Sequence, residues 1–499
     1  MQTTQRQEPS TPSTGHPSYN QQDWQKGYRS LIEEYDYAID EVDGQIPPEL
    51  QGTLFRNGPG LLDVAGQPYH HPFDGDGMIS AIAFQHGRAH FRSRFVRTEG
   101  FVAEQQAKKI LYRGVFGTQK PGGPLANAFD LRRKNIANTN VIYWGGKLLA
   151  LWEAAAPYRL DPSTLETMGL DDLNGGLQPG DAFAAHPWID PASEQDGGAP
   201  CLVNFSITPG LSTKITVYEL SIEGKIQRRY SHAVPGFAFI HDFAITPHYC
   251  IFFQNPVTFN PFPFLLGQKG AAECITFRPD QPTQAVIIDR RGGHAMQVIP
   301  VESGFVFHHA NAFEDGDQLV VDSISYASLP SLAADQDFRE VDFDALSPGQ
   351  LWRFRLNRTT GTAQTELLES RCVEFPSVHP DRVGQPYRYA YMGAAHAAQG
   401  NAPLQAVLKV DLTTGTRHLW SAAPYGYGSE PVFVPRPNAT AEDDGWLLTL
   451  IFNAQRDRSE LVILDAQNLE QGAIATLRLK HHIPYGLHGS FTPECFETF

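Results

Sequence analysis

A-V-L-K-V-D-L-T-T-G-T, residues 406–416, is a run of β-type residues that ends in a tight-turn signal. The same order returns in L-V-I-L-D-A-Q-N-L, residues 461–469, and W-L-L-T-L-I-F, residues 446–452, supplies another hydrophobic strand between them. Hydrophobic strands that alternate with short polar turns predict hairpins. Hairpins in close succession are typical of the four-stranded blades of a β-propeller.

The rest of the chain continues this pattern of short strands and turns. Further β-type runs lie at residues 81–84, 141–152, 215–220, 319–324 and 351–356. Turn signals follow several of them, at Gly145-Gly146, Asp315-Gly316 and Thr359-Thr360-Gly361. Long helical periodicity is absent, so the predicted fold class is all-β.

Segments outside the strands are few. Short helices are expected near Asp23–Tyr35, Glu104–Ile110 and Ser331–Asp337, whereas prolines make Asn255–Gly267 neither a regular helix nor a central strand. Residues 1–22 are rich in Ser, Thr, Pro and Gln, and we expect them to form a disordered N-terminal tail. Because nothing after the tail resembles a linker, residues 23–499 are predicted to form a single β-propeller domain.

Composition and charge argue against several classes of partner and location. The formal net charge is −16, which disfavours a polyanion such as nucleic acid. The five cysteines include no C-x-x-C pair, which fits a reducing compartment and argues against a thiolate zinc site. We see no signal peptide, and no apolar run approaches the roughly 18 residues of a membrane span. The expected location is therefore the cytoplasm.

Six residues of metal-binding type recur at a nearly constant interval. They are His186, His241, His308, Glu374, Glu430 and His488, separated by 55, 67, 66, 56 and 58 residues. An interval near 60 is too long for a helical repeat but suits one four-stranded blade with generous loops. If each blade sends its innermost strand past a common axis, all six side chains converge there.

The residue types at this interval predict a metal site. A single histidine beside apolar residues is usually structural, but four histidines interleaved with two glutamates are hard to explain by packing. Imidazole suits zinc, copper, iron and nickel, yet four imidazoles leave zinc no open position, whereas six-coordinate iron keeps two. Glu374, Glu430 and also Glu153, at the end of a β-type run, fit as acceptors for the imidazole N–H groups.

Other histidines compete for these roles. His309 directly follows His308, and neighbouring side chains of a strand point to opposite faces, so only one of the two can face the axis. The neighbouring residues do not decide which one does. The doublets His70-His71 and His481-His482 do not fit the interval, and we expect them to be surface or structural residues.

Several motifs around these residues closely resemble the carotenoid cleavage oxygenase family. They are L-F-R-N-G-P-G (54–60), H-P-F-D-G-D-G-M (71–78), N-I-A-N-T-N (135–140), F-A-F-I-H-D-F-A-I-T (237–246), G-F-V-F-H-H-A-N-A-F-E (304–314) and H-H-I-P-Y-G-L-H-G-S-F (481–491). The resemblance covers essentially everything after the N-terminal tail. Within the family, the chain looks most like the bacterial enzymes that cleave apocarotenoids at the 15,15′ bond to form retinal.

This resemblance implies a seven-bladed β-propeller with Fe²⁺ on its axis and a dome of loops and short helices over the metal. It implies that His186, His241, His308 and His488 bind the iron. Glu153, Glu374 and Glu430 would hydrogen-bond three of these ligands, and His186 would have no carboxylate partner. The implied reaction uses O₂ to split one C=C bond of a long polyene into two carbonyl compounds, with no side chain acting as acid, base or nucleophile.

An apolar tunnel should lead the polyene to the iron. Trp152 and Phe239 lie beside presumed ligands in the sequence, and Phe73, Phe116, Thr139 and Tyr326 resemble tunnel or near-iron positions of the family. An apolar wall suits an apolar substrate, although each of these residues is also compatible with an ordinary inner-strand core.

A separate hypothesis concerns contact with a membrane, because carotenoids reside in lipid. The run 259–266 carries Phe259, Phe262, Phe264 and Leu265, a candidate apolar patch for peripheral membrane contact. The alternative is that this run is a buried loop that covers a blade.

Three other functions remain open. The same iron chemistry could act on a stilbene-like phenolic alkene, which would require polar groups that bind a phenol. A non-catalytic propeller scaffold would have no bound metal and no reason for the His/Glu interval. A zinc or calcium hydrolase is disfavoured because the predicted ligands are all histidines.

Overall fold

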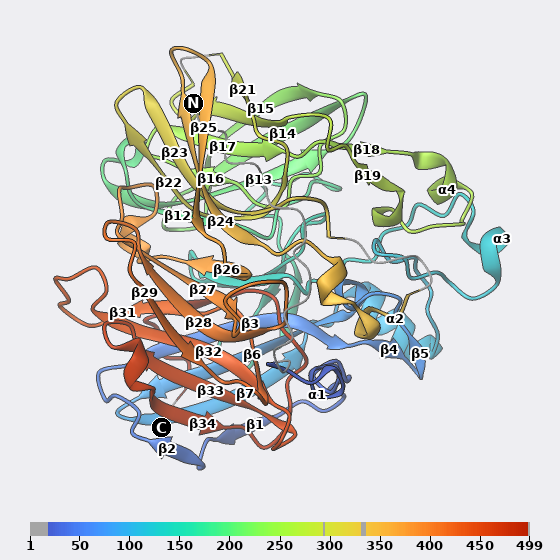
Figure 1. The fold of residues 1–499 in the computed structure, drawn as a ribbon. Coiled ribbons are helices and arrows are strands. Elements are labelled where there is room, and N and C mark those ends of the chain that lie inside the picture. The colour runs from blue at the N-terminus through green and yellow to red at the C-terminus, as the bar shows by residue number, and fades with distance from the viewer. Residues whose placement is uncertain (1–17, 293–294, 331–335, 498–499) are drawn as a thin grey trace.

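The computed structural model describes residues 18–292, 295–330 and 336–497, which form seven sheets of four or more strands. All pairings within these sheets are antiparallel, and the sheets follow one another around a ring (Figure 1). The predicted all-β class and the seven-bladed propeller are confirmed.

Five blades are each built from one continuous stretch of chain. The first contains β8 (Asn140–Trp144), β9 (Lys147–Leu151), β10 (Tyr158–Leu160) and β11 (Thr167–Leu170), and the second contains β12 (Trp188–Ser193), β13 (Ala199–Thr208), β14 (Ser212–Leu220) and β15 (Ile226–Pro235). The third contains β16 (Ala244–Ile245), β17 (Tyr249–Gln254), β20 (Thr283–Asp289) and β21 (Gln297–Val301), and the fourth contains β22 (Phe305–Asp315), β23 (Gln318–Tyr326), β24 (Gln350–Asn357) and β25 (Thr362–Glu369). The fifth contains β26 (Val373–Ser377), β27 (Tyr389–Ala395), β28 (Leu404–Asp411) and β29 (Arg417–Ser421).

The remaining two blades close the ring by combining both ends of the chain. One contains β30 (Gly426–Gly428), β31 (Val432–Pro435), β32 (Gly445–Asn453), β33 (Arg458–Asp465) and β34 (Ala473–Arg478), and takes β2 (Val42–Gly44) at its outer edge. The other contains β1 (Asp36–Ala38), β7 (Arg88–Phe95), β6 (Asp76–Gln85) and β3 (Gly52–Leu61), and takes the C-terminal β35 (Gly489–Thr492) at its inner edge. The first and last parts of the propeller are therefore held together by two exchanged strands.

The core lies between the blades. An apolar cluster fills each interface between neighbouring sheets. Phe205, Phe243 and Phe252, for example, pack with ring centroids 5.0 to 5.3 Å apart between the second and third of the continuous blades. Because both faces of a blade are covered by neighbours, its strands are apolar along most of their length, as in the run 446–452.

The turn in residues 411–416 forms as the sequence predicts. Thr413 and Thr414 donate their backbone N–H groups to the Asp411 side chain, and Gly415, at φ 74°, donates its own to the Asp411 carbonyl oxygen at 2.7 Å. An aspartate that accepts local N–H groups and a glycine at positive φ together reverse the chain from β28 into β29. The other predicted β-type runs also lie in strands.

Three of the helices and two small hairpins gather on one side of the ring. Helices α2 (Glu99–Ala107), α3 (Gly123–Asn127) and α4 (Pro261–Leu265) and the hairpin of β18 (Val257–Phe259) and β19 (Ile275–Phe277) lie together at the right of Figure 1, with the small hairpin of β4 (Asp63–Val64) and β5 (Gln67–Pro68). Short 3-10 turns cover Pro72–Asp74, Glu194–Asp196, Ala272–Cys274, Phe338–Glu340, Phe343–Ala345, Pro380–Arg382 and Leu469–Gln471. We use the name dome for helices α2, α3 and α4, the hairpins β18–β19 and β4–β5, and the loops that join them on this side. No helix in the described part of the chain has the length and apolar character that a membrane span requires.

The predicted boundary of the N-terminal tail at residue 22 is too late. Helix α1 (Gln21–Gln25) begins before it, because the Asn20 side chain accepts the N–H groups of Gln22 and Asp23 and so caps the helix. Tyr19 also packs against Phe343, with ring centroids 5.7 Å apart. Residues 1–17 of the predicted tail and 331–335 of one predicted helix lie outside the described residues.

Candidate metal centre

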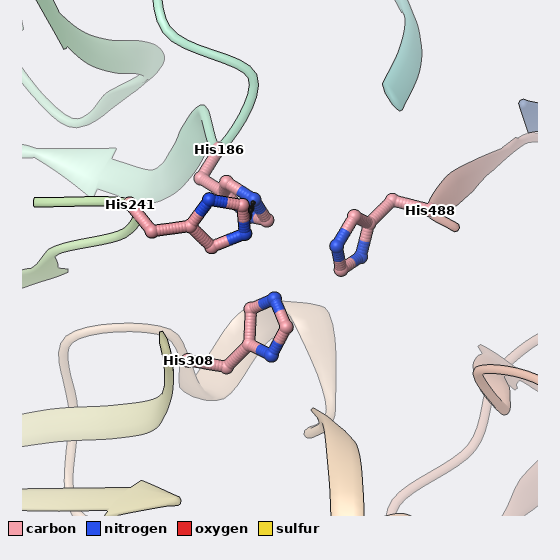
Figure 2. A group of neighbouring side chains, drawn as sticks. All are labelled: His186, His241, His308 and His488. Atoms are coloured by element: carbon pink, nitrogen blue, oxygen red, sulfur yellow. Dashed lines mark hydrogen bonds between the residues drawn. The ribbon is translucent and has the colours of Figure 1, made fainter. Parts of the chain in front are cut away.

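Four histidines converge on the axis of the ring. His186, His241 and His488 lie just before β12, β16 and β35, the edge strands of their blades nearest the axis, and His308 lies inside β22. Figure 2 shows their four rings pointing toward one another from four directions. Each histidine offers one ring nitrogen to a group whose members all lie within 4.8 Å of one another. The structure thus brings together the four histidines that the sequence interval selects.

Three of the rings are held from behind by carboxylates. Glu374 contacts Nδ1 of His308 at 2.5 Å, Glu430 contacts Nδ1 of His488 at 2.9 Å, and Glu153 pairs with Nδ1 of His241. A carboxylate accepts the Nδ1–H, so it fixes the tautomer whose Nε2 lone pair faces the axis. His186 makes no such pair among the described contacts, as the family resemblance implies.

In the blade of β8–β11, a threonine stands at the position that histidine or glutamate occupies in the other six blades. Thr139 directly precedes β8, and its carbonyl oxygen accepts the backbone N–H of His488 at 3.1 Å. Glu374 lies in β26 and Glu430 lies between β30 and β31, so the seven positions complete one turn of the ring. The sequence interval misses Thr139 because its side chain is not of metal-binding type.

The residues fit a metal ion at this point. Nε2 of His308 is buried without a hydrogen-bond partner, and Nε2 of His186 lies 2.9 Å from Nε2 of His241. Nε2 of His241 presents a lone pair here because Glu153 holds its Nδ1 proton, so this close pair and the orphaned nitrogen of His308 fit a cation that lies among them. Ligands bound at roughly 2.0–2.1 Å from one ion lie about 3 to 4 Å apart, and these four nitrogens lie within 4.8 Å of one another.

Burial and neighbouring charges set the protonation of the centre. Burial, aided by the neighbouring imidazoles, lowers the pKa of His186 well below its usual value, and burial lowers that of His488 to about 4 despite Glu430. Both imidazoles are therefore neutral near pH 7, and each can offer a nitrogen lone pair to a metal ion. The pKa of His308 is raised, because Glu374 outweighs the effect of burial, so a positive charge is favoured beside this ring.

A family model confirms the relationship that the motifs suggest. The model of RPE65, the retinal pigment epithelial membrane protein family, matches residues 28–493. The chain belongs to this family. The predicted membership in the carotenoid cleavage oxygenases is thereby confirmed.

Individual relatives of the family cover nearly the whole chain. Apocarotenoid-15,15′-oxygenase from Synechocystis sp. is 59% identical over 484 residues, which are 97% of this chain and 99% of the relative. Isoeugenol monooxygenase from Pseudomonas nitroreducens is 32% identical over 91% of this chain and 94% of its own length. The crystal structure of cobalt-substituted Synechocystis apocarotenoid oxygenase superposes with a TM-score of 0.94 at 59% identity, over 96% of this chain and 100% of that one.

A β-bulge explains which member of the His308-His309 doublet faces the axis. The register of β22 against β23 shifts on both sides of His309, so His308 is left out of the ladder. His309 instead turns into its own blade, where Nδ1 contacts the Ser323 hydroxyl at 2.8 Å and the ring packs on Phe253. The geometry favours His308 as the axial residue, as the family resemblance does.

Three side chains at the centre were assigned no supporting role from the sequence. Arg56 donates to Glu430, and Tyr326 donates its hydroxyl to Glu374 at 2.7 Å, so both support a carboxylate. Phe375 packs its ring 5.6 Å from that of His308 and 5.2 Å from that of His488. Arg56 interrupts an otherwise uncharged, fully buried strand, and that interruption is a signal the sequence offered.

Phe375 has a strained backbone. Its φ is +54°, which is rare for a bulky residue, and the register of β26 against β27 shifts at this point. Its N–H donates to the carboxylate of the preceding Glu374 at 2.6 Å. The strain therefore coincides with a contact that holds a carboxylate of the centre, and no sequence pattern announces it.

The predicted tunnel residues divide between the centre and the dome. Thr139 and Trp152 are buried near the axis, Tyr326 contacts Glu374, and Phe239 packs against Phe305 with ring centroids 5.9 Å apart. Phe73 and Phe116 lie farther out, at 5.3 Å from each other, and the ring of His71 packs against both. His71, expected to be a surface or structural residue, thus belongs to an aromatic cluster with two of the predicted tunnel residues.

The predicted membrane patch is only partly exposed. The Phe262 side chain is 69% exposed, but Phe264 lies beneath the guanidinium of Arg113 and Phe259 stacks on Phe237. Exposed apolar side chains continue on the neighbouring segment with Leu125, Phe129 and Leu131. The N–H of Phe129 donates to the carbonyl oxygen of Leu265 at 2.8 Å, so the two segments lie side by side.

Proposed function

We propose that the protein is a non-haem Fe²⁺ dioxygenase that cleaves one C=C bond of an apocarotenoid with O₂. The expected bond is 15,15′, and the products would be retinal and a shorter carbonyl compound. The observation that carries the proposal is the set of four axial histidines, three of them held by glutamates. Support for the substrate comes from the relative named apocarotenoid-15,15′-oxygenase, which is 59% identical over nearly the full length of both chains.

His186, His241, His308 and His488 would hold the iron. When bound there, ferrous iron supplies the binding and activation of O₂. Four imidazole ligands would leave two of six coordination positions free, whereas a tetrahedral zinc ion would have none, so the ligand number favours iron. In atom balance, one O₂ and one C=C bond give two carbonyl groups, and no other reactant is needed.

The side chains of the protein hold and orient rather than react. Glu153, Glu374 and Glu430 retain the Nδ1 protons of three ligands and keep their Nε2 atoms aimed at the axis. The aromatic residues around the centre, among them the buried Trp152 and the half-buried Phe375, limit the access of water to it. Because the aromatic cluster of Phe73 and Phe116 lies in the dome, the dome would select the substrate and its position.

Reconstitution with Fe²⁺ in the absence of O₂, followed by exposure to O₂ and a panel of alkenes, tests the proposal. We expect about one iron per chain by mass spectrometry of the metal, and retinal from an apocarotenoid by chromatography. Cleavage of resveratrol or isoeugenol in preference to every apocarotenoid would contradict the substrate and favour the phenolic alternative. A protein that takes up no iron would contradict the function itself and favour a scaffold.

We also propose that the dome docks on a lipid bilayer, the phase in which an apocarotenoid dissolves. The dome patch consists of Leu125, Phe129, Leu131, Phe262 and Leu266, which are between 46% and 95% exposed. These residues lie on and around α3 and α4, and Arg132, Arg133 and Lys269 are exposed beside them. Apolar side chains bordered by basic ones suit the boundary between acyl chains and headgroups.

Vesicle sedimentation tests this docking. Replacing Leu125, Phe129 and Phe262 together with serine should greatly reduce binding to phosphatidylcholine vesicles while turnover of detergent-dissolved substrate persists. The matched control replaces Leu211 and Ile222, exposed by 101% and 51% at turns of another blade, and should bind as the wild type does. Equal vesicle binding by the two variants would refute the dome patch as the docking surface.

A further inference from the structure

The three carboxylates of the centre differ in what supports them. Glu153 has no partner other than His241 among the described contacts. Glu374 accepts a neutral phenol O–H from Tyr326 and the backbone N–H of Phe375. Glu430 accepts a hydrogen bond from the guanidinium of Arg56 and another from the backbone N–H of Gly489, at 3.0 Å. One of three otherwise similar pairs is therefore neutralised by a cation.

Arg56 is fixed in place by its surroundings. It lies in β3, its side chain is 5% exposed, and Nη1 contacts the same carboxylate whose other oxygen holds His488. Nη2 donates to the carbonyl oxygen of Leu487 at 2.8 Å, so Arg56 grips both the residue before the ligand and the carboxylate behind it. This contact spans the ring closure, since β3 pairs with β35.

The other side of Arg56 faces a narrow cavity. Its Nε is buried without a partner in the protein, and the cavity is lined by Arg56 together with the hydroxyl-bearing residues Ser80, Ser429, Ser459 and Tyr427. Arg56 therefore stands between this cavity and Glu430. The guanidinium is required at this point to keep a buried carboxylate paired.

Charges at the centre can be counted directly. Glu153, Glu374 and Glu430 contribute three negative charges next to the ligands, and Arg56 contributes one positive charge. With a divalent ion, this set is neutral; with a trivalent ion, it carries one positive charge. Asp242, also buried nearby, accepts the backbone N–H groups of Phe243 and His309 and the indole N–H of Trp188, and its charge acts on His308 and His241 without a hydrogen bond to either ring.

We propose that Arg56 is a positioning residue that keeps the bound iron divalent. Through Glu430 it weakens the pull on the Nδ1 proton of His488, which makes this imidazole a poorer donor, and its own charge opposes a third positive charge on the metal. Both effects favour the ferrous state. This inference rests on the proposed function, because it requires iron at the axis.

Four variants separate charge from packing: Arg56→Met, Arg56→Lys, Glu430→Gln and the double variant Arg56→Met with Glu430→Gln. Each is loaded with Fe²⁺ and titrated against redox mediators, and ferric iron is followed by electron paramagnetic resonance. At one fixed potential, Arg56→Met should raise the ferric-to-ferrous ratio by roughly tenfold, because loss of a positive charge near the metal stabilises the ion of higher charge. Glu430→Gln should lower the ratio, and Arg56→Lys and the double variant should lie near the wild type.

A matched control addresses the general effect of losing a buried ion pair. Arg353 binds both oxygens of Asp322, at 2.8 and 2.7 Å, in the middle of a blade. Arg353→Met should lower Tm without moving the ratio. If Arg56→Met does not fold, the double variant is compared with Glu430→Gln: a higher ratio in the double variant supports the proposal, and an equal ratio overturns it.

Two further outcomes would overturn the role of Arg56. One is an unchanged ratio in Arg56→Met, and the other is an equal shift in Arg56→Lys, which would assign the effect to geometry. The metal content of the wild type, measured first, distinguishes this failure from failure of the proposed function. Absence of iron in the wild type removes both proposals, whereas iron with an unchanged ratio removes only the inference about Arg56.

Discussion

The axis and the dome of this protein are built on opposite principles. At the axis, seven blades place one residue each at equivalent positions, and short strands hold these residues from Thr139 to His488. The dome is made of short helices and hairpins inserted between strands, and its contacts follow no interval. The regular part thus collects the residues for metal chemistry, and the irregular part surrounds the approach to them.

The axis and the dome meet two different structural requirements, one for metal binding and one for substrate choice. A metal site requires fixed ligands, which a ring of repeated blades supplies at little conformational cost. Substrate choice requires a surface of one particular shape, which inserted loops can change without disturbing the ligands. Variants at the axis should therefore affect metal and activity together, whereas variants in the dome should affect substrate use alone.

The largest effect is expected at the axis itself. His241→Ala removes one of four imidazoles and should abolish both bound iron and turnover. His309→Ala is the matched control, because His309 is a neighbouring buried histidine that packs into its blade, and it should lower Tm while iron is retained. Metal analysis and product chromatography on the same samples check both. Full activity in an iron-free His241→Ala protein would contradict the metal centre.

A smaller effect is expected behind the ligands. Glu374→Gln keeps the shape of the side chain but weakens its hold on His308, and should reduce iron affinity by roughly 10- to 100-fold. Tyr326→Phe removes only the hydroxyl that supports Glu374 and should cost less. Iron retention during dialysis against a graded chelator measures both. Identical retention in the wild type and Glu374→Gln would show that this carboxylate does not orient the ligand.

A still smaller effect is expected in the dome. Phe116→Ala removes a ring that packs against Phe73 and His71, and such aromatic contacts are worth about 0.5–1.5 kcal/mol each. We expect KM for an apocarotenoid to rise severalfold while the iron content stays at the wild-type level. Steady-state kinetics and metal analysis check this. Loss of iron in Phe116→Ala would break the separation between axis and dome.

The smallest effect concerns acid and the dome. Burial lowers the pKa of His71 to about 3, below the value near 6.5 of the unfolded chain, so the folded state binds fewer protons between these values. Stability from His71 is therefore complete above pH 6.5 and is lost as pH falls toward 3. Changing from pH 7.5 to pH 5 should lower the Tm of the wild type by about 2 °C more than that of His71→Phe. Parallel melting curves measure this difference, and an equal loss would exclude His71.

The same contrast explains what the sequence could predict. The interval from His186 to His488 is visible because blade length is nearly constant, and it located the axis and two of the three carboxylates, Glu374 and Glu430. The interval did not reveal Thr139, because threonine is not a residue type that usually binds metal ions. Of the dome, Phe73 and Phe116 were identified only through the family resemblance, since no period places them.

Contacts across long stretches of chain were beyond prediction. Arg56 meets Glu430 from a position 374 residues away, and the pairing depends on which strand closes the ring. The choice between His308 and His309 depends on a bulge, and the positive φ of Phe375 depends on a register shift. Each is decided by how strands pair, which alternation of residue types does not record. The tail boundary was misplaced for a simpler reason, since the cap at Asn20 lies within a polar run.

The exchanged strand β35 also links closure of the ring to assembly of the metal centre. His488 immediately precedes this strand, and Glu430 and Arg56, which hold it, come from the last and first blades. The four imidazoles therefore come together only when β35 is docked on β3. Closure of the ring and assembly of the candidate metal centre are thus the same event, and loss of the β3–β35 pairing would remove His488 from the axis.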